Sequence, residues 1–340
     1  MSRHIIPMKP RLFALALLLL VAACAPTVQM RGSEVTTPIL SEGVAIMDDG
    51  YRLPLKIWRA PPDIEERAVI IGLHGMNDYS NAFAEPGPWF ASRGVSFYAY
   101  DQRGFGQTRQ RGIWAGTELL TSDLRTIVPL VASVHPGKPI FVLGESMGGA
   151  VVLATMGAPK PPAVAGVILS APAVWGRVTM NPLYRIALWL VPRIAPGEQL
   201  TGQGLKIQAS DNIPMLIALG RDPLVIKGTR ADSVSGLADL MDEGLAAAPR
   251  LKVPSLVLYG EKDEVVPKAP VERMVETLGG PHRVAVYDNG WHLLLRDLDR
   301  EVVWQDILTW TMDRRAPLPS DSEKQPGSLF ASNRNKSNFN

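Results

Sequence analysis

At the centre of the chain lies the segment Phe141-Val-Leu-Gly-Glu-Ser-Met-Gly-Gly149. Its apolar start is typical of a buried strand, and the residues after Gly149 are typical of a helix. The segment therefore predicts a sharp turn between strand and helix, with Ser146 at the apex. Glycines two residues before and two after this serine would let the strand and the helix approach each other. The free N–H groups at the helix start would favour a negatively charged oxygen beside Ser146.

The pattern Gly-x-Ser-x-Gly is weak evidence alone, because a glycine-rich turn before any helix can produce it. The rest of the chain is more informative. Short apolar runs alternate with helix-length segments, and an opening hairpin is expected around Asp49-Gly50. This alternation predicts an α/β fold with a mostly parallel sheet that is flanked by helices on both faces. The expected core strands are Ala68–Leu73, Val95–Tyr100, Ile140–Leu143, Ala165–Leu169, Ser255–Tyr259 and Arg283–Tyr287.

One connection is too long for a simple crossover, which needs about a dozen residues. It runs from Val174 to Ala248 and predicts an inserted helical cap over the carboxyl ends of the strands, where α/β sheets place their sites. Asn181-Pro182 is a good helix start, because Pro fits the first helical position. The helix that follows is apolar nearly all round. It would either pack on the core or offer an apolar wall to acyl chains or to a membrane.

An activated serine needs a histidine base within hydrogen-bond reach, and a carboxylate orients that histidine. The chain has five histidines. His4 lies in a signal-like segment, while His135 and His282 precede strands and belong at the opposite edge of the sheet from the serine. His74 ends a strand at the correct edge, but a glycine-containing turn follows it at once. His292 follows the last expected strand at the correct edge, so it is the candidate base.

The carboxylate should also follow a strand. The loop after the expected strand Ser255–Tyr259 contains three candidates. Asp263 fits best, and Glu261 and Glu264 are alternatives. The chain order is then Ser146, Asp263, His292, which is the order of the α/β-hydrolase triad. Hydrolysis by this set should increase with pH as His292 loses its proton.

The tetrahedral oxyanion of acyl transfer needs hydrogen-bond donors. One should be the backbone N–H of Met147, directly after the nucleophile. The other should come from the turn His74-Gly-Met-Asn-Asp78, as the N–H of Met76. We expect His74 and Gly75 to shape this turn rather than to react. The segment Asp101-Gln-Arg-Gly-Phe-Gly106 also follows a strand and is expected to be a structural turn beneath the site.

Composition limits the other function classes. The formal net charge of +2 indicates no strong attraction to nucleic acid. The single cysteine, Cys24, excludes an intramolecular disulfide, and the chain has no CxxC pair or His/Cys cluster with zinc spacing. We therefore expect no metal. No feature indicates the oligomeric state.

The N-terminus has the features of a secretory signal peptide. Basic residues precede an apolar run over residues 12–23, which is shorter than the roughly 20 residues of a membrane-spanning helix. The expected organisation is a signal peptide over 1–23, a polar tether over 24–43, a core over 44–173 and 249–315, a cap over 174–248, and a disordered tail over 316–340.

Val21-Ala-Ala-Cys24 resembles the lipobox of bacterial lipoproteins. The resemblance implies that Cys24 is diacylated and becomes the mature N-terminus, and acylation by two or more chains gives stable membrane anchoring. Because Ala25 follows the cysteine, the resemblance also favours the outer membrane, with the protein facing the periplasm. The alternative is an ordinary signal cleaved after Ala23 or Ala25, which would leave a soluble periplasmic protein.

The chain resembles the monoglyceride lipase and lysophospholipase group of serine hydrolases over roughly residues 44–313. This resemblance implies the α/β-hydrolase fold and hydrolysis of carboxylic esters of lipids, without a cofactor. The matching stretches are His74-Gly75, Asp101-x-Arg103-Gly104-x-Gly106, Gly144-x-Ser146-Met147-Gly148-Gly149, Arg221-Asp-Pro-Leu224, Gly260-x-x-Asp263 and Gly290-x-His292.

Two positions depart from that group. Relatives often have His directly before the nucleophile, where this chain has Glu145, and often have a second glycine in the oxyanion turn, where this chain has Asn77. The oxyanion donors are backbone groups, so these changes bear on the substrate more than on the chemistry.

The leading hypothesis is a serine hydrolase that cleaves monoacylglycerol or lysophospholipid. The first alternative is an aminopeptidase of the same fold, which would need an acidic cap residue such as Asp211, Asp222 or Asp232 to hold the substrate ammonium. A dehalogenase or epoxide hydrolase is disfavoured because those enzymes use Asp at the nucleophile position. A non-catalytic envelope adaptor on this fold is the alternative from another class, although degenerate members usually lose a triad residue.

Overall fold

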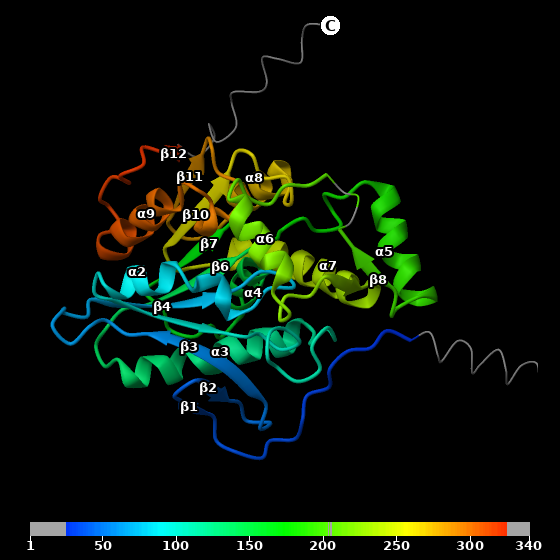
Figure 1. Ribbon diagram of the computed structural model, residues 1–340, viewed down its shortest axis with the longest axis horizontal. Helices are drawn as coiled ribbons and strands as arrows, with labels where there is room; N and C mark the ends of the chain where they lie inside the picture. The colour runs from blue at the N-terminus through cyan, green and yellow to red at the C-terminus, as the bar shows by residue number, and fades with distance from the viewer. Residues whose placement is uncertain (1–24, 203, 205, 325–340) are drawn as a thin grey trace, which may run out of the picture.

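A ten-stranded sheet forms the centre of the molecule within residues 25–202, 204 and 206–324, which the computed structural model describes (Figure 1). In spatial order its strands are β1 (Ile39–Ser41), β2 (Val44–Ile46), β3 (Arg52–Trp58), β5 (Val95–Tyr100), β4 (Ala68–Leu73), β6 (Ile140–Glu145), β7 (Gly166–Ser170), β10 (Ser255–Gly260), β11 (His282–Tyr287) and β12 (Glu323–Lys324). The six strands from β5 to β11 are parallel to their neighbours. β3 and β12 pair antiparallel at the two sides.

The sequence prediction of a mostly parallel sheet is therefore confirmed. β4 and β5 have the predicted bounds, and both are buried along their whole length because helices cover both faces of the sheet. The hairpin around Asp49-Gly50 is formed by β2 and β3. The short edge strand β1 was not predicted from the sequence.

Helices cover the sheet on both faces (Figure 1). Side chains alternate along each strand, so Val69 and Ile71 of β4 join one core cluster and Ile70 joins the other. The first cluster is covered by α3 (Thr117–Val134), α4 (Met147–Met156), α7 (Ala231–Ala247) and α8 (Lys268–Thr277). The second is covered by η1 (Ser80–Phe83), α2 (Pro86–Ala91) and α9 (Arg300–Met312).

The long connection after β7 contains α5 (Pro182–Ile194), β8 (Gln199–Thr201), α6 (Ile213–Arg221), β9 (Gly228–Arg230) and α7. α5 begins where the sequence predicts, and the Asn181 side chain accepts a hydrogen bond from the Tyr184 N–H at 3.0 Å. α7, however, packs against α4, and Gly244 faces the Ala150 backbone closely. The predicted cap over 174–248 therefore includes a core helix, because small residues let α7 approach α4.

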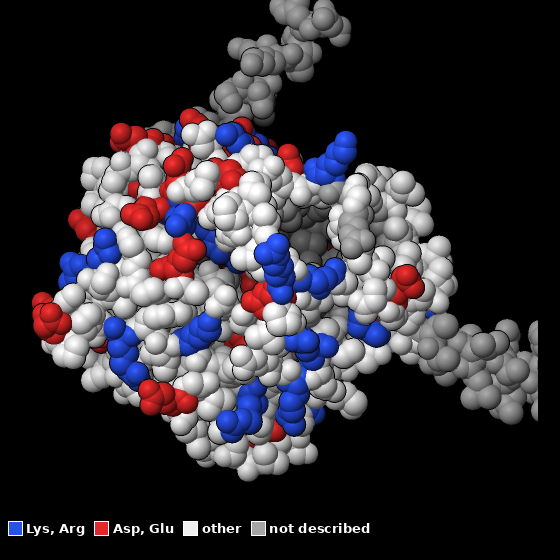
Figure 2. All heavy atoms as spheres, viewed as in Figure 1, with Lys and Arg blue, Asp and Glu red and all other residues white. Residues whose placement is uncertain are grey.

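The first cap helix, α5, packs on the core along one side only, where Leu188 contacts the first core cluster. Pro192 is its only buried residue within the described part of the chain. Leu183 is 72% exposed and Trp189 is 59% exposed. The surface over α5 also has few charged side chains on the face shown in Figure 2. The cap therefore presents apolar side chains to its surroundings.

The segment expected to be a tether over 24–43 is partly fixed to the body. Gln29 is 5% exposed, its N–H donates to the Trp114 carbonyl at 2.8 Å, and its side chain donates to the Ile113 carbonyl at 2.8 Å. The Thr27 N–H donates to Asp232 of α7 at 3.0 Å. These bonds satisfy backbone groups that a free tether would leave to water.

Two expectations fall on residues that the structure does not describe. The predicted signal peptide over 1–23 and the predicted lipidation site, Cys24, lie outside the described residues. Among the residues that are described, no helix combines the length and the apolar character needed to cross a membrane.

The C-terminal prediction over 316–340 was wrong for its first part. Leu318 is 3% exposed and belongs to the core cluster that contains Trp304 of α9. The Ser320 N–H donates to the buried Asp306 carboxylate at 3.0 Å, and β12 extends the sheet. Leu318 and the buried Asp306 carboxylate therefore help to dock this polar segment, and residues 325–340 lie outside the described residues.

Replacing Leu318 by Ala tests this correction. Removal of a buried leucine side chain should lower the free energy of unfolding by about 2–5 kcal/mol, measured by urea denaturation. Leu298→Ala is the matched control, because Leu298 is 60% exposed and its truncation should change stability by less than about 0.5 kcal/mol. Equal stability of the Leu318→Ala variant and the unmodified protein would contradict the docking of residues 316–324.

Candidate active site

Ser146 occupies the turn between β6 and α4 with φ 53° and ψ −115°, a conformation that is uncommon for any residue with a side chain. The flanking glycines explain how this turn fits. A Cβ on Gly144 would lie 2.5 Å from the Gly148 carbonyl, and a Cβ on Gly148 would lie 2.2 Å from the Leu73 oxygen. The predicted need for small residues around the serine is confirmed, since only glycine avoids these contacts.

The sheet brings the predicted residues to one edge. Ser146 follows β6, the oxyanion turn follows β4, Asp263 follows β10 and His292 follows β11. These strands are parallel, so all four segments leave the sheet at its carboxyl edge. The loops of the acid and of the base also touch, because the Lys262 N–H donates to the Gly290 carbonyl at 2.9 Å.

His292 and Asp263 form a buried pair. The His292 Nδ1–H donates to Asp263 Oδ2 at 2.8 Å, and the side chains are 5% and 0% exposed. Asp263 Oδ1 accepts the N–H groups of Val265 at 2.8 Å and Val266 at 2.9 Å. These bonds hold Asp263 in one orientation and leave Nε2 of His292 as the basic nitrogen.

The two alternative acids have other partners. Glu261 accepts hydrogen bonds from the Lys268 ammonium at 2.6 and 2.8 Å. Glu264 accepts the Gln208 N–H from the cap at 2.7 Å. The geometry therefore favours Asp263 as the residue that orients the histidine.

The expected oxyanion turn lies against the serine. A Cβ on Gly75 would lie 3.3 Å from the Ser146 Cβ, so the turn passes directly beside the nucleophile. Among the residues that the structure describes, the N–H groups of Met76 and Met147 have no hydrogen-bond acceptor. Two free donors next to one serine suit a developing oxyanion.

His74 supports this turn and is completely buried. Its Nδ1–H donates to the Gly75 carbonyl at 2.8 Å, and its Nε2 accepts the Gln102 N–H at 3.0 Å. Burial lowers the pKa of His74, which keeps the ring neutral. Because both ring nitrogens are engaged, His74 shapes the turn, and the segment that begins at Asp101 supports it from below.

The remaining histidines are not near the serine. His135 follows α3, where its Nδ1 pairs with Glu66 at 2.7 Å and its Nε2 pairs with the Tyr98 hydroxyl at 2.7 Å. His282 is the first residue of β11, at the other end of that strand from the catalytic edge. His4 lies outside the described residues.

Sequence reasoning missed a buried charge cluster beneath the site. Arg296 pairs with Glu145 at 2.9 Å and with Asp78 at 2.8 Å, and all three side chains are at most 8% exposed. The only sequence signal is an arginine within Leu293-Leu-Leu-Arg-Asp-Leu298, where an apolar run contains two charges. Burial without carboxylates would be prohibitive for this guanidinium, and the two carboxylates raise its pKa further above its ordinary value.

The histidine loop is also tied to the cap. Asp297 accepts the Trp291 N–H at 2.7 Å and the Ser210 hydroxyl at 2.6 Å. The Asn212 side chain donates to the Arg296 carbonyl at 2.9 Å. Burial raises the pKa of Asp297 to about 6, since its charged form loses water. Cap residues 210–212 therefore help to fix the loop that carries the base.

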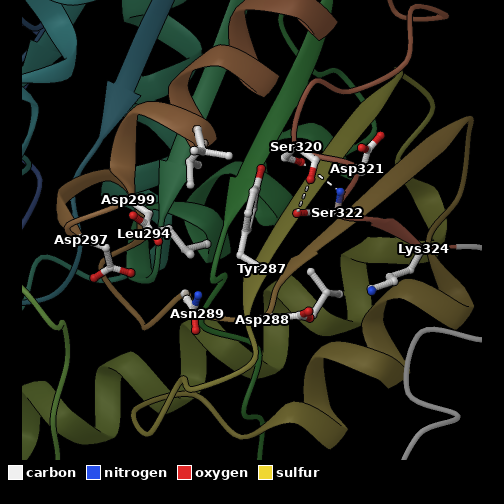
Figure 3. Close-up of a pocket in the computed structure, with 14 residues that line it drawn as sticks. Tyr287, Asp288, Asn289, Leu294, Asp297, Asp299, Ser320, Asp321, Ser322 and Lys324 are labelled. Atoms are coloured by element: carbon white, nitrogen blue, oxygen red, sulfur yellow. Dashed lines mark hydrogen bonds between the residues drawn. The ribbon is translucent and has the colours of Figure 1, made fainter.

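A separate cavity of about 220 Å³ opens between β11, the loop after it and residues 320–324 (Figure 3). Tyr287 extends through it, and its hydroxyl donates to Asp306 at 2.8 Å. None of its lining residues is Ser146, Asp263 or His292. The cavity therefore does not contain the reacting groups.

The described part of the chain has no group of three or more His, Cys, Asp or Glu residues that could hold a metal ion.

A serine on a strand–helix turn, with an Asp–His pair from later strand ends of the same sheet, defines a serine hydrolase of the α/β-hydrolase fold. A comparison with family models agrees with this class. The chain belongs to the family described as serine aminopeptidase, S33, whose model matches residues 64–299.

Similar proteins narrow the class further. The chain is 28% identical to a monoacylglycerol lipase of Mycolicibacterium smegmatis over 268 residues, which cover 77% of this chain and 93% of that protein. It is 24% identical to a phospholipase of Bacillus subtilis over 258 residues, with 75% and 97% covered. A solved monoglyceride lipase from Saccharomyces cerevisiae superimposes with a TM-score of 0.68 at 21% identity, with 86% and 99% covered. The protein is thus an α/β-hydrolase-fold serine ester hydrolase of the monoacylglycerol lipase-like type.

The choice of acid is tested by Asp263→Asn. The amide cannot stabilise the imidazolium and favours the wrong tautomer of His292, so kcat on a soluble ester should fall by about 10⁴. Glu261→Gln and Glu264→Gln are matched controls and should keep kcat within about twofold. A large loss in either control, with activity retained in Asp263→Asn, would assign the acid to the other carboxylate.

Proposed function

We propose that this protein hydrolyses carboxylic esters of single-chain lipids, either monoacylglycerol or lysophospholipid, through an acyl-enzyme on Ser146. The observation that carries the proposal is the geometry of one sheet edge. A strained serine, a buried Asp263–His292 pair and two free N–H donors lie on loops that leave the sheet at the same edge. Similarity to a monoacylglycerol lipase and to a phospholipase supports the lipid class.

The proposed reaction begins with attack of Ser146 Oγ on the ester carbonyl carbon. Nε2 of His292 takes the hydroxyl proton, and Asp263 stabilises the imidazolium through its bond to Nδ1–H. The carbonyl oxygen becomes an oxyanion that accepts the N–H groups of Met76 and Met147. His292 then gives its proton to the leaving alcohol, and water hydrolyses the acyl-enzyme by the same steps.

The cap supports an apolar substrate. Its first helix exposes Leu183, Ile186 and Trp189, and α6 exposes Ile213 and Ile217. Exposed apolar side chains of this number on one inserted segment are typical of a site that meets apolar ligands. A long acyl chain would cover them, and a small polar ester would not.

The aminopeptidase alternative gains no support from the three cap carboxylates that were considered for it. Asp211 accepts a backbone N–H at 2.8 Å, and Asp222 accepts the Tyr79 hydroxyl at 2.7 Å. Asp232 accepts a bond from Arg230 Nε at 2.9 Å. Each carboxylate that was considered for binding a substrate ammonium is already engaged within the protein.

A substrate panel tests the proposal. Short- and long-chain nitrophenyl esters, monoacylglycerols, lysophospholipids and amino-acid amides are compared, with Ser146→Ala as control. We expect turnover of the lipid esters that falls by at least about 10³ in Ser146→Ala. Preference for amino-acid amides would support the aminopeptidase, and no turnover of any substrate would support the non-catalytic adaptor.

We further propose that the protein is a lipoprotein, anchored through acylated Cys24 in the bacterial outer membrane and facing the periplasm. The lipobox resemblance of Val21-Ala-Ala-Cys24 supports this proposal.

Cys24→Ser tests the anchor. This variant cannot be acylated, so it should move from the membrane fraction to the soluble fraction while its activity on a soluble ester is kept. Ala25→Ser is a neighbouring control that should stay with the membrane. Retention of Cys24→Ser in the membrane fraction would show that the protein is held there by something else.

A further inference from the structure

The reacting groups lie on three loops that are far apart in the sequence. One side chain, that of Arg296, connects all three loops. Glu145 directly precedes the nucleophile, and Asp78 ends the oxyanion turn. Arg296 ends η3 (Leu294–Arg296), the short helix that follows His292. Its Nη2 donates to Glu145 Oε1 at 2.9 Å, and its Nη1 pairs with Asp78 Oδ2 at 2.8 Å. The guanidinium therefore joins the loops of the nucleophile, the oxyanion donor and the base.

The two bonds are directional. A guanidinium is a rigid planar fork, so its two terminal nitrogens set the distance between the carboxylates that they bind. Asp78 in turn holds the end of the oxyanion turn, because its Oδ1 accepts the Tyr79 N–H at 2.8 Å. The Arg296 carbonyl accepts the Asn212 side chain, which holds the arginine loop itself in place.

Nothing else among the described residues replaces these bonds. The second carboxylate oxygen of Glu145 and the Nε of Arg296 are buried and have no hydrogen-bond partner there. Glu145 therefore depends on Arg296 alone for compensation of its charge. A neutral histidine at the position of Glu145 could not form the same ion pair with Arg296.

We propose that Arg296 is a positioning residue, which sets the spacing of Ser146, the Met76 N–H and His292 through its ion pairs with Glu145 and Asp78. It does not touch the substrate. Displacement of a reacting group by about 1 Å can lower the rate on the order of 100-fold. Loss of the two guanidinium bonds should therefore lower kcat more than it changes KM. This inference rests on the proposed function, since the spacing matters only if these groups react.

The test replaces Arg296 by Lys, which keeps the positive charge but offers one ammonium in place of the fork. On a short soluble nitrophenyl ester, Arg296→Lys should lower kcat at least about tenfold and leave KM within about twofold. The pH at which kcat is half-maximal should stay unchanged, because the effect is one of geometry. The positive charge of the lysine alone should therefore not be enough to maintain kcat.

Arg283→Lys is the matched control. Arg283 also joins separate segments, because it donates to Glu323 at 2.7 Å and to the Arg314 and Ala316 carbonyls at 2.7 and 2.8 Å. It lies near the start of β11, at the other end of that strand from the catalytic edge, and pairs with none of the three catalytic loops. Its replacement should lower thermal stability as Arg296→Lys does, with kcat within about twofold. An equal fall of kcat in both variants would assign Arg296 a purely structural role. A displaced pH profile or a rise in KM alone would also overturn the proposal.

Two further variants keep the test valid if Arg296→Lys does not fold. Glu145→Gln and Asp78→Asn each weaken one arm of the fork, and each should lower kcat without a change in KM. Combination of Glu145→Gln with Arg296→Lys should lower kcat little more than Arg296→Lys alone, since both act through one contact. Independent, multiplicative effects would contradict the coupling. If the unmodified protein turns over no ester, the proposed function fails instead.

Discussion

The backbone of Ser146 is the constraint on which the site depends. A serine at φ 53° persists only because strand β6 and helix α4 approach so closely that Gly144 and Gly148 have no room for a side chain. This turn pushes the hydroxyl out of the sheet and aims the start of α4 at the same point. The N–H of Met147 and the turn at Gly75 then lie beside the serine as a consequence of sheet order.

Much of this arrangement could be predicted from the sequence. Parallel strands leave long buried apolar runs, so β4 and β5 were found with their observed bounds, and the edge of the sheet then selected His292 over the other histidines. Asp263 was the preferred acid from the sequence, and the structure supports that preference because Glu261 and Glu264, on the same loop, bond to other groups. The order of the strands predicts which loops lie close together. It does not predict which carboxylate of the loop bonds to the His292 ring.

The parts that escaped prediction depend on single long-range contacts. Leu318 docks a polar segment that composition alone assigns to disorder, and small residues of α7 bring a predicted cap helix into the core. Arg296 is the strongest case, since its partners lie far away in the chain. A buried guanidinium is stable only with carboxylates around it, and neither the apolar run near Arg296 nor the Gly-x-Ser-x-Gly pattern predicts which carboxylates these are.

The most direct test of this account is the site of covalent modification by a long-chain fluorophosphonate, mapped by peptide mass spectrometry. The account predicts one adduct, on the peptide that contains Ser146, and a labelling rate that falls at least about 100-fold in a His292→Ala variant, which keeps the serine but lacks its base. An adduct on another residue, or none at all, would contradict the assignment of Ser146 as the nucleophile. An unchanged labelling rate in His292→Ala would contradict His292 as its base.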